Sequence, residues 1–139
     1  MQTLDFEGRK IGDAYPAYVI SEIGVNFNTF DEGKKLIDAS VAAGVDCVKI
    51  QTFKAENVIS KNTPKAIYQM QTTSRSESQL EMVKKLELSY ELHYKLMAYC
   101  NKKGINFLST AFDNESLDFL KNDFKLQTFK IPSGEITNG

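Results

Sequence analysis

The chain has 139 residues, 42% of them hydrophobic and 25% charged, a composition typical of one ordinary globular domain rather than a disordered segment. Its 17 Lys and Arg nearly balance its 18 Asp and Glu, so no overall positive field attracts a nucleic acid or an anionic membrane surface, and any bound anion must be held locally. The sequence contains no apolar run of the roughly 20 residues needed to cross a bilayer, and it shows no secretory leader. The two cysteines, Cys47 and Cys100, lack CxxC spacing. These three observations predict a reduced cytoplasmic protein.

The first strands and the first helix are marked clearly. A capping box formed by Thr29 and Glu32 predicts the start of a helix, and Gly44 predicts its end just before the second strand. The four apolar runs that predict strands are residues 17–23, 46–51, 105–109 and 127–131.

A long polar excursion follows the second strand, over residues 53–89. It is too long for a simple connector, which favours a functional loop or lid, and its pattern predicts short helices at 65–70 and 79–86. A longer helix is predicted over residues 90–104, and a shorter one is predicted after Asp113, which can cap it.

The alternation of strands and helices predicts an α/β fold, a parallel sheet covered by helices. A closed (β/α)8 barrel needs about 250 residues, so four strand and helix steps that stop at residues 136–139, just after a strand, predict the N-terminal half of such a barrel. With no linker in the sequence, residues 1–139 form one incomplete domain in this interpretation. The alternative is a complete small open sheet, which should end with a covering helix.

Polar side chains stand at the end of every predicted strand. The carboxyl ends of parallel barrel strands meet at one mouth, where the active sites of such barrels lie, so we expect these side chains to converge. They are Glu22, Lys49, Gln51, Thr110, Lys130, Ser133 and Glu135.

Lys49 and Lys130 are the most informative of these residues. An ammonium group flanked by buried strand residues is costly unless it is paired, so the two lysines predict a pocket for a carboxylate or a phosphate. The alternative is that they only form buried ion pairs with Glu22 and Glu135.

Other chemistries find less support in the sequence. His93, the single histidine, shares a helix with Leu92 and Leu96, which favours a partly buried or surface imidazole over a catalyst or a metal ligand. No metal-ligating cluster and no Ser, His and Asp arrangement can be assembled around it. The charged stretch at residues 74–81 is interpreted as a solvated face.

Four collinear motifs resemble the N-acetylneuraminate synthase family: SEIGVN at 21–26, VKIQTF at 48–53, LSTAF at 108–112 and FKIPSGEITN at 129–138. The resemblance implies a barrel followed by a small antifreeze-like domain in a domain-swapped homodimer. It also implies condensation of phosphoenolpyruvate with N-acetylmannosamine or a related N-acylated amino sugar, assisted by Mn²⁺ or Mg²⁺ whose histidine ligands lie on strands absent from this chain.

The resemblance also implies roles for the polar residues at the strand ends. Lys49, Thr110, Lys130 and Ser133 are expected to bind phosphoenolpyruvate. Gln51 and Glu22 are expected to face the sugar or the reacting centre, and Glu135 is expected to act as an acid, a base or an orienting carboxylate.

Three residues depart from the family pattern. Phe27 replaces a common His, Ala111 a common Pro, and Pro132 a usually small residue. Phe27 is expected to alter how the first loop meets the sugar. A second hypothesis, of a different class, is a catalytically inactive half-barrel that associates through its unpaired edge strands with a second copy or a complementary half.

Overall fold

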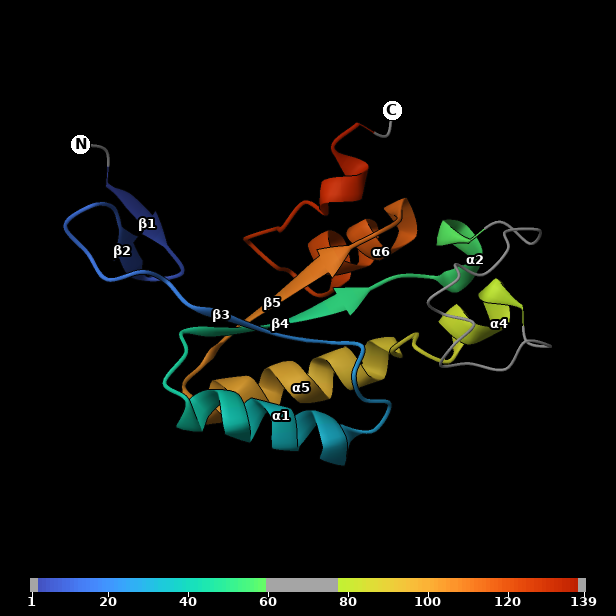
Figure 1. The fold of residues 1–139 in the computed structure, drawn as a ribbon, viewed down its shortest axis with the longest axis horizontal. Coiled ribbons are helices and arrows are strands. Elements are labelled where there is room, and N and C mark those ends of the chain that lie inside the picture. Colours follow the sequence, from blue (N-terminus) through green and yellow to red (C-terminus); the bar gives the residue numbers. More distant parts are fainter. Residues whose placement is uncertain (1–2, 60–77, 138–139) are drawn as a thin grey trace.

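The computed structural model describes residues 3–59 and 78–137. At its centre is a parallel sheet of three strands in the order β3, β4, β5. The helices α1 and α5 lie side by side on one face of this sheet (Figure 1). The bounds of these elements are β3 (Ile20–Gly24), α1 (Phe30–Ala42), β4 (Cys47–Thr52), α5 (Tyr90–Lys103) and β5 (Asn106–Ala111).

Local signals in the sequence set the helix ends. The Thr29 side chain accepts from the Glu32 amide, and the Glu32 carboxylate accepts from the Thr29 amide at 3.1 Å, so the predicted capping box of α1 is confirmed. Helix α5 ends at Gly104, whose φ of 69° is the left-handed conformation that favours glycine. Asp113 caps the short helix α6 (Asn114–Asp118), also as predicted.

The main core fills the space between the sheet and the two helices. Phe27 belongs to it and is only 3% exposed, so its ring packs in the interior, and any effect of Phe27 on how the first loop meets a sugar acts through this packing. A Cβ at Gly33 would lie 3.0 Å from the Phe27 ring, so glycine allows this close packing. The buried members of the core are Ile23, Phe27, Ile37, Val48, Ile50, Leu88, Leu92, Leu96, Cys100 and Ile105.

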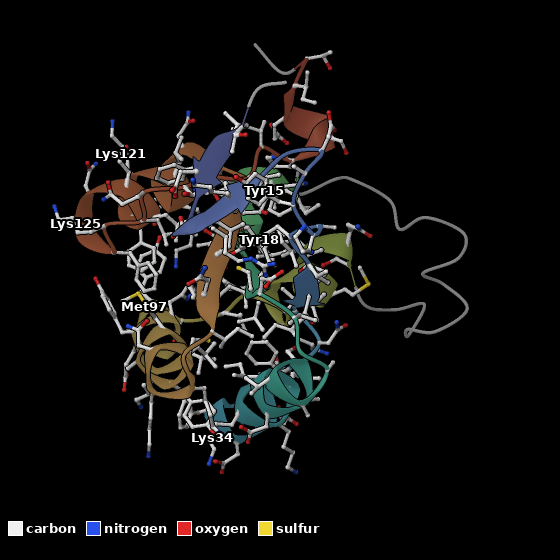
Figure 2. All side chains as sticks on the ribbon, turned by 90° about the vertical axis from the view of Figure 1, so that its left-hand side faces the viewer. Tyr15, Tyr18, Lys34, Met97, Lys121 and Lys125 are labelled. Carbon is white, nitrogen blue, oxygen red and sulfur yellow. The ribbon has the colours of Figure 1, made fainter. Side chains whose placement is uncertain are left out.

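An N-terminal hairpin that the sequence analysis missed packs near the amino ends of the strands (Figure 1). Its strands are β1 (Leu4–Phe6) and β2 (Arg9–Ile11), joined by Glu7 and Gly8, both with positive φ. A glycine in a two-residue loop between short strands was the available signal. The Asn106 side chain donates to the Glu7 carbonyl and, at 2.8 Å, to the Tyr18 hydroxyl. Figure 2 shows Tyr18 beside the hairpin ribbon.

The predicted fourth strand does not form, so that prediction is wrong. Residues 127–131 follow a π-helix, η1 (Phe119–Asp123), and carry no ladder hydrogen bonds, and Ile131 is 61% exposed. The Leu126 amide bonds back to the Leu120 carbonyl, which turns the chain away from β5. In the described part of the chain, this segment also has no strand on its far side, and a strand with at most one neighbour gains few ladder bonds.

The excursion after β4 begins and ends near the carboxyl ends of the strands (Figure 1). Helices α2 (Ala55–Val58) and α4 (Gln79–Lys84) are described, which confirms the predicted helix near 79–86. The predicted helix at 65–70, and the first half of the stretch at 74–81, lie outside the described residues. Within the described ranges, no helix is long and apolar enough to cross a membrane.

Candidate functional site

Four of the predicted site residues share one face of the sheet. Successive side chains of a strand point to opposite faces, and Val48, Ile50 and Thr52 of β4 face the helices. Lys49 and Gln51 therefore face away from α1 and α5. Glu22 is in register with Lys49, and Thr110 is in register with Gln51, so both lie on the same face as their partners.

Lys49 forms an ion pair with Glu22 on this face. The Lys49 side chain is 13% exposed and the Glu22 side chain is 42% exposed, so the pair lies at the edge of the solvent. The pairing of Lys49 with Glu22 that the alternative expected is present, although the pair is not fully buried. Burial, followed by the positive charge of Lys130, lowers the pKa of Lys49. The positive charge of Lys130 thus opposes that of Lys49, and a bound anion would offset both charges.

Thr110 and Gln51 lie beside this ion pair. Thr110 is 1% exposed, and its hydroxyl has no hydrogen-bond partner among the described residues. Because a buried hydroxyl without a partner is costly, a hydrogen bond to a ligand would stabilise it. A Cβ at Gly24 would lie 3.0 Å from Glu22 Oε1 and 3.6 Å from Gln51 Nε2, so this glycine lets the carboxylate and the amide approach the backbone.

The other predicted residues lie beyond the end of β5. Lys130 and Glu135 line a cleft of about 360 Å³, whereas Ser133 begins the short helix η2 (Ser133–Glu135) and does not line it. Lys130 is exposed, so the expectation that buried strand residues flank it is wrong. The cleft is lined by Ala111, Phe112, Asp113, Asn114, Leu117, Phe129, Lys130, Ile131, Pro132 and Glu135.

Asp113 has a larger part in the site than its predicted role as a helix cap. Its carboxylate accepts from the Lys54 amide at 2.8 Å and from the Ser116 amide at 2.9 Å, so it joins the loop after β4 to the start of α6. Burial acts to raise the pKa of Asp113, but hydrogen bonds from Ser116 and Lys54 outweigh it, and the pKa falls below its ordinary value. Its position directly after the polar end of β5 was the signal for this wider role.

The remaining reactive groups are buried: Cys47 lies at the amino end of β4, on the same face as Lys49 but beside Tyr18, whereas Cys100 and His93 lie on the helix side of the sheet. Burial raises the pKa of the Cys47 thiol to about 11 and of the Cys100 thiol to about 12, so both free cysteines are neutral thiols at pH 7. His93 is completely buried, deeper than predicted. Over residues 3–59 and 78–137, no three His, Cys, Asp or Glu side chains gather in a way that fits a metal ion.

Comparison with known proteins identifies relatives of this chain. A sequence profile of the NeuB family matches residues 36–139. The chain is 52% identical over 121 residues to the N,N'-diacetyllegionaminic acid synthase of Campylobacter jejuni, covering 86% of this chain and 36% of that protein. It is 45% identical to the synthase of the same name from Legionella pneumophila, covering 91% of this chain and 36% of that protein. The chain thus spans about a third of the length of these relatives.

Solved structures share the fold. The N-acetylneuraminic acid synthetase of Leptospira borgpetersenii, crystallised with citrate, matches with a TM-score of 0.77 at 25% identity, over 99% of this chain and 43% of that one. The spore coat polysaccharide biosynthesis protein SpsE of Bacillus subtilis matches with a TM-score of 0.68 at 29% identity, over 94% of this chain and 33% of that one. The α/β class and the partial barrel are confirmed, with three parallel strands in place of four.

Proposed function

Because this chain belongs to the NeuB family, the family of the sialic acid synthases, we propose that the whole protein condenses phosphoenolpyruvate with an N-acylated amino sugar to give a nonulosonic acid. The observation that carries the proposal is the polar face shared by the paired Lys49 and by Thr110, whose hydroxyl has no partner among the described residues; the positive charge of Lys130 also acts on Lys49. An anion with a carboxylate and a phosphate suits this combination of charge and donors.

The chemistry assigns a task to each group. The enol carbon forms a bond to the sugar aldehyde, water adds to the resulting cation, and the tetrahedral intermediate expels phosphate. Lys49 and Lys130 neutralise the phosphoenolpyruvate anion, while Thr110 and Ser133 donate hydrogen bonds to it. These four residues hold the anion through every step, so the charges of Lys49 and Lys130 and the hydroxyls of Thr110 and Ser133 also favour the departing phosphate.

The remaining residues act on the sugar side. Gln51 and Glu22 orient the sugar or the reacting centre, and Glu135 acts as an acid, a base or an orienting carboxylate. A divalent metal, Mn²⁺ or Mg²⁺, would supply Lewis-acid polarisation of the aldehyde when bound in the whole protein, and it would be held by residues outside this chain. We also propose a homodimer for the whole protein.

Equilibrium binding tests the anion site. Titrating phosphoenolpyruvate into the chain by calorimetry should show binding that weakens by at least about tenfold in Lys49→Met, the loss expected for a charged hydrogen bond. Lys34→Met is the matched control, because Lys34 lies on α1 with its ammonium 5.4 Å from the centre of the Tyr99 ring, and Figure 2 shows it pointing away from the sheet. Equal affinities of the wild type and Lys49→Met would refute the site.

The chain alone should not catalyse condensation, because it spans about a third of its relatives' length. A mixture of phosphoenolpyruvate, Mn²⁺ and N-acetylmannosamine should release no phosphate above background. The amino sugar that leads to N,N'-diacetyllegionaminic acid should be assayed in parallel, since the 52% identical relative bears that product's name. Phosphate release with either sugar contradicts this prediction.

Association is the second candidate function. In the described part of the chain, β3 and β5 form the two edges of the sheet, and Ile20 is 38% exposed beside the polar face. Parallel edges without neighbours favour pairing with another chain. Size-exclusion chromatography with light scattering should therefore detect a species larger than the 15.7 kDa monomer, and a single monomeric peak at all concentrations contradicts association.

A further inference from the structure

Three buried polar side chains form a hydrogen-bonded network on the helix face of the sheet, opposite the face that carries the candidate site. His93 of α5 and Ser109 of β5 are 0% exposed, and Thr52 of β4 is 1% exposed. Thr52 Oγ1 lies 2.7 Å from His93 Nε2 and 2.6 Å from Ser109 Oγ. Polar groups in an apolar interior are costly unless they are hydrogen-bonded, and here each of the three has a partner.

The partners of His93 determine which atom donates in each hydrogen bond of this group of side chains. His93 Nδ1 lies 2.8 Å from the Ser89 carbonyl oxygen, which can only accept, so Nδ1 carries the proton. In a neutral imidazole Nε2 is then an acceptor, and the Thr52 hydroxyl must donate to it. Because Thr52 has a single hydroxyl proton, its oxygen accepts from Ser109 at 2.6 Å, and the Ile50 carbonyl at 3.3 Å is a longer second acceptor for the same Ser109 proton.

This arrangement holds β4 and β5 in register at the point where the site begins. The residue opposite Ser109 is Ile50, so the bond from Ser109 to Thr52 runs diagonally across the two strands. Thr52 directly follows Gln51, and Ser109 directly precedes Thr110. Since neighbouring side chains alternate between faces, anchoring Thr52 and Ser109 on the helix face sets the positions of Gln51 and Thr110 on the other.

The surroundings leave the imidazole little freedom. The rings of Tyr90, Phe119 and Phe124 pack around it at centroid distances of 6.2, 5.5 and 6.2 Å. The carbonyl that accepts from it belongs to Ser89, the N-cap of α5, whose side chain accepts from the Leu92 amide at 3.2 Å. The His93 end of these hydrogen bonds is therefore held both by packed rings and by the capped start of α5.

We propose that His93 is a positioning residue, which acts through Thr52 and Ser109 to fix Gln51 and Thr110 for ligand binding on the opposite face of the sheet. The proposal rests on the proposed function for the identity of the ligand, phosphoenolpyruvate. A supporting shell of this kind holds the residues that contact a ligand in their productive geometry.

Three variants of the full chain test this proposal. His93→Leu removes both ring nitrogens, and Thr52→Val removes the central hydroxyl while keeping a similar shape, which covers the case in which His93→Leu does not fold. Leu96→Ala is the matched control, because Leu96 is 0% exposed one turn further along α5 and takes no part in the hydrogen-bonded network. It is expected to lower stability without disturbing the site.

Two measurements are made on each variant. The first, without ligand, is the NMR chemical shift of the Thr110 methyl and of the Gln51 side-chain amide. Where the His93 ring is present, its ¹⁵N shifts are recorded as well. The second is the calorimetric affinity for phosphoenolpyruvate. We expect the wild type to show the Nδ1–H tautomer, and His93→Leu and Thr52→Val to shift the Thr110 and Gln51 signals and to weaken binding by about tenfold. Leu96→Ala should leave both measurements near wild type.

The outcomes separate this proposal from the proposed function. A wild-type chain that does not bind phosphoenolpyruvate counts against the function, and the shifts alone then decide the positioning role. Unchanged Thr110 and Gln51 shifts in the folded variants, or wild-type affinity in both where the wild type binds, overturn the positioning role. An Nε2–H tautomer of the His93 ring overturns it as well.

Discussion

The single histidine of the chain makes its acid stability a sharp test of the structure. His93 is completely buried, and burial lowers its pKa below the ordinary value of about 6.5 despite the hydrogen bond to Ser89. The charge of Lys54, held 4.3 Å from the centre of the Tyr90 ring, acts in the same direction. The folded protein therefore favours the neutral imidazole.

The sign and size of the effect follow from proton linkage. As the pH falls below about 6.5, the unfolded chain binds a proton at His93 before the folded chain does, so stability falls. The slope is at most about 1.4 kcal/mol per pH unit, which amounts to about 2 kcal/mol between pH 6.5 and pH 5.0 if the folded ring stays neutral. His93 contributes no pH dependence only about one pH unit or more above 6.5, where the imidazole is neutral in both the folded and the unfolded state.

Urea unfolding at pH 7.0, 6.5, 5.5 and 5.0, followed by circular dichroism, measures this slope. His93→Gln is the comparison, since glutamine can hydrogen-bond but does not titrate. The carboxylates with shifted pKa values, Asp113 among them, have pKa values below their ordinary range. Their contribution to folding stability is therefore lost mainly at pH values below the range used for His93. If the wild type and His93→Gln show the same slope between pH 6.5 and pH 5.0, the account of the buried imidazole is refuted.

Two further substitutions test how the ends of the elements are built. Gly104→Ala should destabilise the chain by about 1 kcal/mol, because alanine must then adopt a φ of 69°. Gly134→Ala is the control and should change the midpoint of urea unfolding little, because Gly134 has no positive φ and has open space around it. Asp113→Ala should cost about 1–2 kcal/mol through loss of the α6 cap and of the bond to the Lys54 amide, while Asp118→Ala, an exposed change in the same helix, should cost less than about 0.5 kcal/mol. If Gly134→Ala lowers the midpoint of urea unfolding as much as Gly104→Ala does, the role of Gly104 at the end of α5 is contradicted. If Asp118→Ala lowers it as much as Asp113→Ala does, the role of Asp113 as the cap of α6 is contradicted.

Signals that act over a few residues were read correctly from the sequence. The capping box at Thr29 and Glu32, the glycine stop at Gly104 and the Asp113 cap each depend on backbone groups within one turn, so the residues there suffice to predict them. The common face of Glu22, Lys49, Gln51 and Thr110 also follows from local alternation once the strands are parallel and in register.

What failed depended on distant neighbours. Residues 127–131 have the apolar pattern of a strand, but a strand also needs a pairing edge, and no local pattern reports whether one lies alongside. The burial of Phe27 depends on the space above Gly33, and that of His93 depends on hydroxyls of two strands. A pattern of apolar and polar residues along one helix cannot show that Thr52 and Ser109 lie beside the imidazole.

The central claim is that the charges of Lys49 and Lys130 face one place that suits an anion. A pH titration of the Lys49 ammonium by ¹⁵N-detected NMR tests it, in the wild type, in Lys130→Met and in the wild type with saturating phosphoenolpyruvate. The account predicts a Lys49 pKa below its ordinary value, a higher pKa in Lys130→Met because a like charge is removed, and a higher pKa again with the ligand bound. A Lys49 pKa that neither Lys130→Met nor phosphoenolpyruvate changes would contradict it.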